Sequence, residues 1–298
     1  MWSRVAKVVT TGSAATFGVM AYLRVSTIDE ALTENCPKKQ LYTWGNNASG
    51  QLGQGSEKNS PIPTLLEHLE HTSIKTVVAK GRNSACIMED TGHVWTFGNG
   101  SHSILGHGDS MDQPNQTLPT KVTGLGNKEC TAVCIGGFHM MVIDDEQKVW
   151  SWGRNNRGQL GLGEGTSGDY GQPQPLSSLT NIVALAAGRQ HSLALNEHGE
   201  VHSWGCGRDG ALGLGDKDIR TSPTKINDLE DVVAIACGRD SSFALTKNGT
   251  LKEFFFLFLC LIVDCIRNPR YLFYLLFEPY TFTFFDTYKF LVSSIYFR

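Results

Sequence analysis

The sequence predicts an all-β fold of the β-propeller type, and three observations lead to this prediction. An aromatic-Gly motif recurs four times, at intervals of about 53 residues. Residues 41–253 hold 30 of the 32 glycines, which indicates many tight turns with positive φ. Short apolar or alternating stretches, such as residues 76–79, 94–97 and 181–185, are typical of strands bounded by turn residues. Short strands repeated in units of this size are the pattern of propeller blades.

Composition and charge exclude several classes of protein. With 298 residues, of which 41% are hydrophobic, the chain can bury a sizeable core and is not disordered. The 26 basic and 29 acidic residues nearly balance, so the basic surface that nucleic acid requires is missing and we expect no nucleic acid as a partner. The 8 cysteines are too few and too irregularly spaced for a disulfide framework, so we expect reduced thiols.

Residues 1–40 form the first of three zones, and we interpret them as a leader segment. Three basic residues precede the first acidic one, Asp29, in a context rich in Ser, Thr and Ala. This pattern is typical of a mitochondrial presequence. The uncharged stretch from Val8 to Leu23 also admits a secretory signal or a short membrane anchor, and a disordered N-terminus remains an alternative. We therefore expect a mitochondrial location, with a cytoplasmic or nuclear location as the alternative.

Residues 41–253 form the second zone, in which the aromatic-Gly pair is followed by a short polar loop and Leu-Gly-x-Gly. The aromatic positions lie 53, 55 and 52 residues apart, which is too regular for coincidence. Another glycine precedes the aromatic residue by 16 positions in three copies, so both signals share one register. The aromatic residues are Trp44, Phe97, Trp152 and Trp204, and the preceding glycines are Gly81, Gly136 and Gly188.

One position of the repeat is apolar in every copy and is therefore predicted to be buried. It lies five residues after each of the preceding glycines, and five residues after Gly238 in the last copy. A cysteine at this position is expected to belong to the core rather than to a reactive site. The residues concerned are Cys86, Met141, Leu193 and Phe243.

Two segments carry a recognisable signature, VHSWG at residues 201–205 with the Leu-Gly-x-Gly run after it, and AGRQHSLAL at residues 187–195. They resemble the repeats of the regulator of chromosome condensation family. The resemblance covers residues 41 to about 253 and implies a seven-bladed propeller. Seven such units would need about 370 residues, so we expect an incomplete propeller of about four of the seven blades.

Residues 254–298 form the third zone, in which the repeat is lost. The register holds to Gly249, but Phe255 stands where a glycine should follow Phe254. This zone holds 11 of the 15 Phe and 5 of the 8 Tyr, and it has no Gly. We interpret it as the aberrant tail of a truncated or mis-spliced product, with a membrane anchor or a packing extension as alternatives. Membrane association through either apolar end of the chain remains open.

One position of the repeat alternates between His and Ser, which favours a buried hydrogen-bonding side chain over a catalytic base. His139 and His191 occupy it in two copies, and Ser84 and Ser241 in the others. Arginines that recur directly after the repeat glycines are interpreted as structural too. These are Arg82, Arg189 and Arg239.

No other pattern predicts a catalytic, cofactor or metal site. The glycine-rich run at residues 161–165 resembles a phosphate loop but lacks the Lys-Ser/Thr pair and a following helix. The cluster Glu67–His71 offers metal-ligand types, although a solvated loop is the favoured interpretation. We therefore expect no cofactor, no metal and no enzymatic activity.

The polar loops between aromatic-Gly and Leu-Gly vary on a repeated frame, and such loops are where partners bind. The family resemblance implies either guanine-nucleotide exchange on a small GTPase or a role as an interaction scaffold. We expect a protein-binding scaffold, with an exchange factor as the alternative, because the longest insertion, residues 164–174, is Gly-rich and offers no exchange wedge. The candidate partner-binding residues are Arg154, Arg157, Arg208 and Asp209.

Overall fold

A computed structural model describes most of the repeat region. Contacts divide the chain into Met1–Phe255 and Phe256–Arg298, and the second unit lies outside the described residues. The predicted tail, residues 254–298, which we interpret as aberrant or membrane-anchoring, also lies outside the described residues. So does most of the predicted leader, residues 1–40, of which the structure describes two short strands and Gln40. The backbone is described for residues 10–11, 20–24, 40–69, 72–80, 84–89, 91–108, 114–247 and 251–253, and side chains for all of these except 10–11, 20–24, 84–89 and 251–253.

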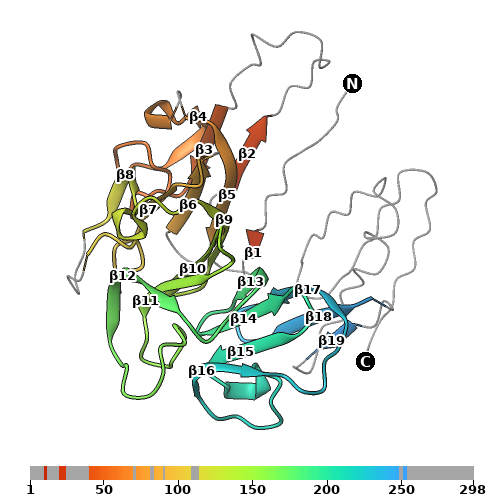
Figure 1. Ribbon diagram of the computed structural model, residues 1–298. Coiled ribbons are helices and arrows are strands. Elements are labelled where there is room, and N and C mark those ends of the chain that lie inside the picture. The colour runs from red at the N-terminus through yellow and green to blue at the C-terminus, as the bar shows by residue number, and fades with distance from the viewer. Residues whose placement is uncertain are drawn as a thin grey trace, which may run out of the picture. The chain divides into compact units, whose positions relative to one another are not determined.

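The described residues form five β-sheets that follow one another along the chain (Figure 1). Within each sheet, strands that are consecutive in sequence pair antiparallel. We number the sheets I to V. Sheet I holds β2 (Met20–Arg24), β3 (Gln40–Gly45) and β4 (Ser60–Leu65), and sheet II holds β5 (Ile74–Lys80), β6 (Ser84–Glu89), β7 (Val94–Gly98) and β8 (Gln116–Lys121), with β1 (Thr10–Thr11) parallel to β5.

Sheets III to V repeat this arrangement, and three short 3-10 helices lie in the connections. Sheet III holds β9 (Cys130–Ile135), β10 (His139–Asp144), β11 (Val149–Arg154) and β12 (Asp169–Leu176). Sheet IV holds β13 (Ile182–Ala187), β14 (His191–Asn196), β15 (Val201–Gly205) and β16 (Arg220–Lys225). Sheet V holds β17 (Val232–Cys237), β18 (Ser242–Thr246) and β19 (Leu251–Glu253), and the 3-10 helices are η1 (Glu67–Leu69), η2 (Thr123–Leu125) and η3 (Arg208–Gly210).

The sheets confirm the predicted all-β propeller architecture and refine the number of blades. In sheets I to IV the aromatic-Gly motif ends the next-to-last strand and connects it to the last one; these are the third and fourth strands of sheets II to IV and the second and third described strands of sheet I. In sheets II to IV two strands precede the motif strand, and β17 and β18 occupy these places in sheet V, so four motifs extend over five sheets within the described part of the chain. None of the described helices is long and apolar enough to cross a bilayer.

The structure corrects the interpretation of residues 164–174 as an insertion. Part of this segment belongs to β12, which pairs with β11 and forms the outer edge of sheet III. Pro173 and Pro175 made a strand hard to predict from the sequence, because proline lacks the N–H that a central strand needs. An edge strand tolerates proline and is protected by it against pairing with other chains. The outer strands of sheets I, II and IV also contain proline.

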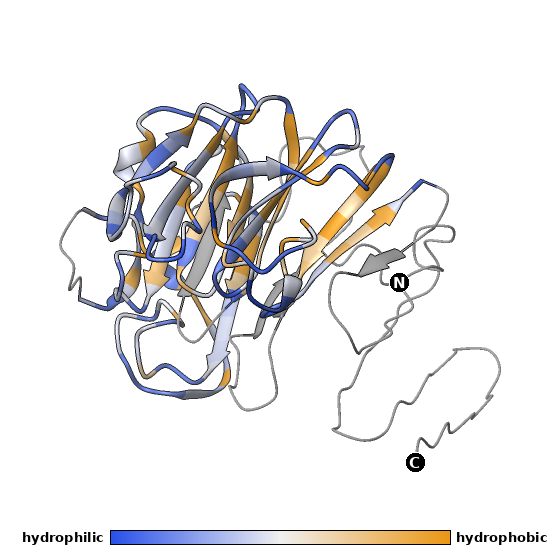
Figure 2. Ribbon diagram, turned by 90° about the horizontal axis from the view of Figure 1, so that it is seen from below, coloured by the Kyte–Doolittle hydropathy of each residue, from blue (hydrophilic) through white to orange (hydrophobic). Residues whose placement is uncertain are grey.

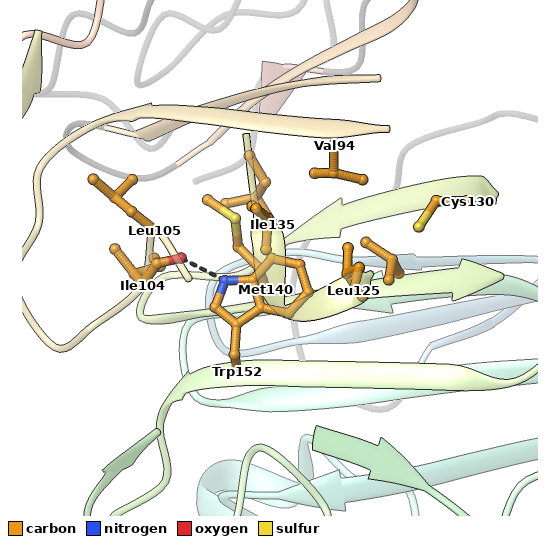
Figure 3. Packing of buried hydrophobic residues seen from close by; sticks show 10 residues of the cluster. Val94, Ile104, Leu105, Leu125, Cys130, Ile135, Met140 and Trp152 are labelled. Carbon is orange, nitrogen blue, oxygen red and sulfur yellow. Dashed lines mark hydrogen bonds between the residues drawn. The ribbon is translucent and has the colours of Figure 1, made fainter. Parts of the chain in front are cut away.

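The core lies between neighbouring sheets, and each buried cluster draws its residues from two of them. Apolar residues follow the strands, whereas the loops are largely hydrophilic (Figure 2). The repeated aromatic residue is central to this packing, since Phe97, Trp152 and Trp204 are each at most 1% exposed. Figure 3 shows Trp152 of sheet III surrounded by apolar side chains from sheets II and III.

The prediction that the apolar repeat position is buried in every copy is wrong for one residue. Met141 and Leu193 are buried, as expected, whereas Phe243 is only half-buried. Phe243 lies on β18 of sheet V, and no described sheet follows sheet V to cover it. The side chain of Cys86 lies outside the described side chains.

Candidate functional site

The strand register brings two repeated features to the same face of the molecule. In sheet III, His139 at the start of β10 pairs with Gly153 near the end of β11, and His191 pairs with Gly205 in the same way in sheet IV. The turn between the first two strands and the loop after the third strand therefore lie at one end of each sheet. We call this side the loop face; the turn between the second and third strands, such as residues 144–148, lies on the opposite face.

The alternating His/Ser position joins neighbouring sheets through hydrogen bonds. His139 Nε2 lies 2.8 Å from Ser192 Oγ of sheet IV, and His191 Nε2 lies 2.9 Å from Ser242 Oγ of sheet V. Each serine hydroxyl donates its proton to a backbone carbonyl of the preceding sheet, so it accepts the histidine N–H. Both imidazoles are buried, which confirms the predicted hydrogen-bonding role of these two histidines.

Burial also sets the charge of these histidines. The pKa of His139 is lowered from 6.5 to about 3 and that of His191 to about 4; burial is the main cause in both, His191 and the Lys80 ammonium add to the shift of His139, and Lys80 adds to that of His191. Both imidazoles are therefore neutral near pH 7. Their N–H groups are directed at the next sheet rather than at solvent, so they stabilise the contact between sheets.

The aromatic-Gly and Leu-Gly motifs form the rest of this contact. Trp152 Nε1 donates to the carbonyl of Ile104 at 2.9 Å, and Trp204 Nε1 donates to that of Gln159 at 2.9 Å (Figure 3 shows the first bond). A Cβ atom on Gly161 would lie 2.9 Å from Trp204 Nε1. The first glycine of Leu-Gly-x-Gly is therefore needed for the close approach of the next sheet's indole. The repeated motifs are used in packing, and the intervening loops remain for recognition.

Two kinds of loop connect the third and fourth strands. In the loop after Trp152, Asn155 Oδ1 accepts the N–H of Leu160 at 3.0 Å, and Asn47 binds Leu52 in the same way in sheet I. In the other two loops a glycine replaces the asparagine, and the residue two positions later has positive φ, 61° for His102 and 62° for Asp209. Positive φ is uncommon for residues other than glycine and marks positions worth functional attention.

The structure places the four predicted site residues on the loop face but does not bring them into one site. Arg157, Arg208 and Asp209 are exposed, and within the described part of the chain their side chains form no hydrogen bond or ion pair. Arg154 is half-buried at the end of β11 and contacts residues of other elements. The prediction of partner binding at these positions stays a prediction.

Arg154 instead belongs to a cluster on the loop face that comes from sheets II, III and IV. The guanidinium carbons of Arg154 and Arg189 each lie 5.6 Å from the centre of the Phe138 ring, over that ring. The His102 ring meets Phe138 edge-on, with the ring centres 5.5 Å apart. His102 Nδ1 lies 3.0 Å from Asp169 Oδ2, and Arg154 Nη1 lies 3.4 Å from His102 Nε2. We call these five residues, His102, Phe138, Arg154, Asp169 and Arg189, the Phe138 cluster.

Sequence reasoning missed most of this cluster and misassigned part of it. The side chains of Arg189 and Arg239 are exposed rather than buried between the sheets, and the backbones of these residues join sheets IV and V, since Arg189 N–H donates to Arg239 C=O at 2.7 Å. Arg82 lies outside the described residues. A signal for Phe138 was present, because the equivalent positions hold Asn, Gln and Asp and only this copy has an apolar residue.

The described residues include only part of the cluster Glu67–His71 and all of the glycine-rich run 161–165. Among the described residues no group of three or more His, Cys, Asp or Glu side chains is placed to hold a metal ion. His68 meets Trp95 edge-on at 6.5 Å, while Glu70 and His71 lie outside the described residues. In the run 161–165, the N–H groups of Gly161 and Gly163 are bonded to backbone carbonyls. The four cysteines with described side chains are free thiols: Cys130, Cys134, Cys206 and Cys237.

Comparisons of sequence with known proteins agree with this architecture. A family model described as the RCC1-like domain matches residues 31–254. The ultraviolet-B receptor UVR8 of Arabidopsis thaliana is 34% identical over 180 residues, which cover 60% of this chain and 40% of UVR8. The RCC1 domain-containing protein RUG3, mitochondrial, also of Arabidopsis thaliana, is 34% identical over 178 residues, which cover 58% of this chain and 39% of RUG3.

Solved structures show the same fold at lower sequence identity. Human WBSCR16 superposes with a TM-score of 0.67 at 23% identity, covering 82% of this chain and 58% of that one. Yeast RCC1 (Prp20), in its complex with Kap60, superposes with a TM-score of 0.62 at 24% identity, covering 72% of this chain and 51% of that one. The chain thus spans about two fifths of UVR8 and RUG3, and between half and three fifths of these solved propellers.

Proposed function

The chain belongs to the RCC1-like domain family, and on that premise we propose that it is a protein-binding scaffold whose partner docks on the loop face. The observation that carries the proposal is the Phe138 cluster, in which sheets III and IV bring two guanidiniums to one aromatic ring and sheet II adds the His102 ring at its edge. Arginine and aromatic residues are the side chains most enriched at the centre of protein interfaces. The scaffold acts by binding alone, without a catalytic step.

The arrangement of the loops suits an interface of ordinary size. A standard interface buries about 800 Å² on each partner, which requires several adjacent loops. The exposed side chains of Arg157, Arg208 and Asp209 lie on the loops of sheets III and IV, on the same face as the Phe138 cluster. We assign these three residues to the surroundings of the cluster, where they contribute to specificity and association rate more than to affinity.

Guanine-nucleotide exchange on a small GTPase is the second candidate function. The similar Prp20p of Saccharomyces cerevisiae has been studied with its binding to Gsp1p and histones, and yeast RCC1 (Prp20) with Kap60 bound. Propellers of this fold therefore bind proteins, which supports both candidates. A mitochondrial location is part of the proposal, and it rests on the leader-like residues 1–28 and on the mitochondrial relative RUG3.

Photo-crosslinking of the full chain in cells tests the scaffold proposal. A photoreactive amino acid is placed at Arg157 or Arg208 on the loop face, and at Glu146, which is exposed in the turn on the opposite face, as the matched control. We expect the loop-face positions to crosslink to one defined protein and the control position not to do so. Equal crosslinking of that protein from Glu146 would contradict docking on the loop face.

The same chain separates the two candidates in a nucleotide-release assay. Release of a fluorescent guanine nucleotide is followed from a panel of small GTPases, with and without the chain. The scaffold proposal predicts no acceleration. Acceleration by 100-fold, about 2.7 kcal/mol of barrier, would favour the exchange factor.

A further inference from the structure

Neither arginine of the Phe138 cluster forms an ion pair with a carboxylate among the residues that the structure describes. Arg189 is exposed, and within the described residues its guanidinium forms no ion pair. Its guanidinium lies over the Phe138 ring in a cation–π contact. Within the same part of the chain, the one hydrogen bond of the Arg154 guanidinium is to His102 Nε2. In contrast, Arg239, which occupies the position of Arg189 in the next sheet, is paired with Asp240 at 3.1 Å.

His102 and Asp169 orient one of these arginines without neutralising it. A guanidinium only donates hydrogen bonds, so His102 Nε2 is the acceptor for Arg154, and the imidazole proton is on Nδ1. That proton is donated to Asp169 Oδ2 at 3.0 Å, so the carboxylate of the cluster binds His102. The side chain of Asp169 is only 14% exposed, so little of it remains for other groups. Both guanidiniums therefore keep free donors on the loop face.

From this geometry we propose that the Phe138 cluster binds an acidic segment of the protein partner, an inference that rests on the scaffold function proposed above. Arg154 and Arg189 each take one carboxylate, since the guanidinium fork matches a carboxylate with two hydrogen bonds. The methylene groups of the acidic side chains pack on Phe138. Because each guanidinium carbon is 5.6 Å from the ring centre, the two lie no more than twice that distance apart. Acidic residues two positions apart in an extended chain, roughly 7 Å, fit this span.

The surrounding carboxylates oppose a nucleic acid more strongly than a short acidic segment, because the nucleic acid carries more negative charge. The chain as a whole carries a net charge of −3, and Asp169, Asp209 and Asp240 lie on the same face as the arginines. A polyphosphate backbone requires an extended basic surface, which these carboxylates interrupt. A short segment with a few carboxylates needs only the two free guanidiniums and the ring between them.

Fluorescence anisotropy with the full chain tests this proposal. The probe is a fluorescein-labelled extended peptide of alternating Glu and Gly, compared with the same peptide carrying Gln or phosphoserine in place of Glu. We expect binding of the Glu peptide, at least tenfold weaker binding of the Gln peptide, and no preference for phosphoserine. Arg189→Ala is expected to weaken binding of the Glu peptide about tenfold, and Arg189→Lys to restore part of it, because lysine keeps the charge but not the fork.

Arg239→Ala is the matched control, because it removes one positive charge from the equivalent turn of the next sheet. It is expected to leave binding unchanged. Each of four results would overturn the proposal. These are an equal loss of binding in Arg189→Ala and Arg239→Ala, equal binding of the Glu and Gln peptides, tighter binding of the phosphoserine peptide, and no binding of the Glu peptide. The scaffold function fails separately, because it requires the loop-face crosslinks whether or not acidic peptides bind.

Discussion

Acidification should lower the free energy of unfolding, because the two buried histidines that join neighbouring sheets are neutral in the folded protein. The folded pKa values of His139 and His191, about 3 and about 4, lie below the unfolded value of 6.5. The unfolded state therefore binds more protons below pH 6.5, and the free energy of unfolding decreases as the pH falls. At pH 5 the loss is about 2 kcal/mol for each histidine, or about 4 kcal/mol for both.

The structure gives a reason why protonation cannot be accommodated locally. His139 Nδ1 is buried and has no hydrogen-bond partner within the described residues, so an added proton there would have no acceptor. A loss of about 4 kcal/mol is large beside the 5–15 kcal/mol by which domains are usually stable. The prediction is measured by urea unfolding of the full chain at pH 7 and pH 5, followed through the fluorescence of the buried Trp152 and Trp204.

The matched comparison is between the native chain and the double variant His139→Gln, His191→Gln, since glutamine donates an N–H but does not titrate. The decrease from pH 7 to pH 5 should be about 4 kcal/mol smaller in the double variant. His198→Gln, at a side chain that is 68% exposed, should leave the decrease unchanged. An equal decrease in the native chain and the double variant would refute the assignment of the acid sensitivity to the joined histidines.

Three further predictions concern the packing motif and the leader. Gly161→Ala should destabilise the fold by about 1–3 kcal/mol more than Gly165→Ala. Both glycines have φ +76°, but only a Cβ at position 161 would crowd an indole. Similar losses of stability in urea unfolding would contradict this. Trp204→Phe keeps an aromatic side chain but removes the donor to Gln159 C=O and part of the buried ring, and should cost at least about 1–2 kcal/mol; an unchanged unfolding midpoint would contradict a packing role for this indole. Residues 1–28 fused to a fluorescent reporter should direct it to mitochondria, and a diffuse cytosolic or secretory-pathway signal would exclude this leader.

Local patterns in the sequence predicted the repeat, several of its strands and most of the packing residues that were named. The spacing of aromatic-Gly and Leu-Gly gave the repeat, and the shared His/Ser position indicated a buried hydrogen bond, as found between His139 and Ser192. These features repeat because the contacts between sheets III and IV and between sheets IV and V use the same pair of hydrogen bonds, from a histidine to a serine and from that serine to a backbone carbonyl. The edge strand β12 was missed because its prolines have the same signature as a loop, and the incomplete burial of Phe243 depends on the next sheet along the chain rather than on its own repeat.

The candidate site was less predictable, because it depends on the juxtaposition of three sheets. His102, Phe138 and Arg189 come from three different repeats, and no spacing within one repeat brings them together. Their alignment follows from the stacking of sheets II, III and IV, which only the three-dimensional structure shows. Arg154 was selected from the sequence for its charge and its place in a variable loop, and the structure gives it specific neighbours.

Hydrogen–deuterium exchange of the full chain, alone and with the crosslinked partner, tests most directly the claim that the loop face is the docking surface. We expect slower exchange on binding in the turns at residues 136–139 and 188–191 and in the loop at residues 154–169, with no change in the opposite turn at residues 144–148. Protection confined to residues 144–148 and the other opposite-face connections would contradict it.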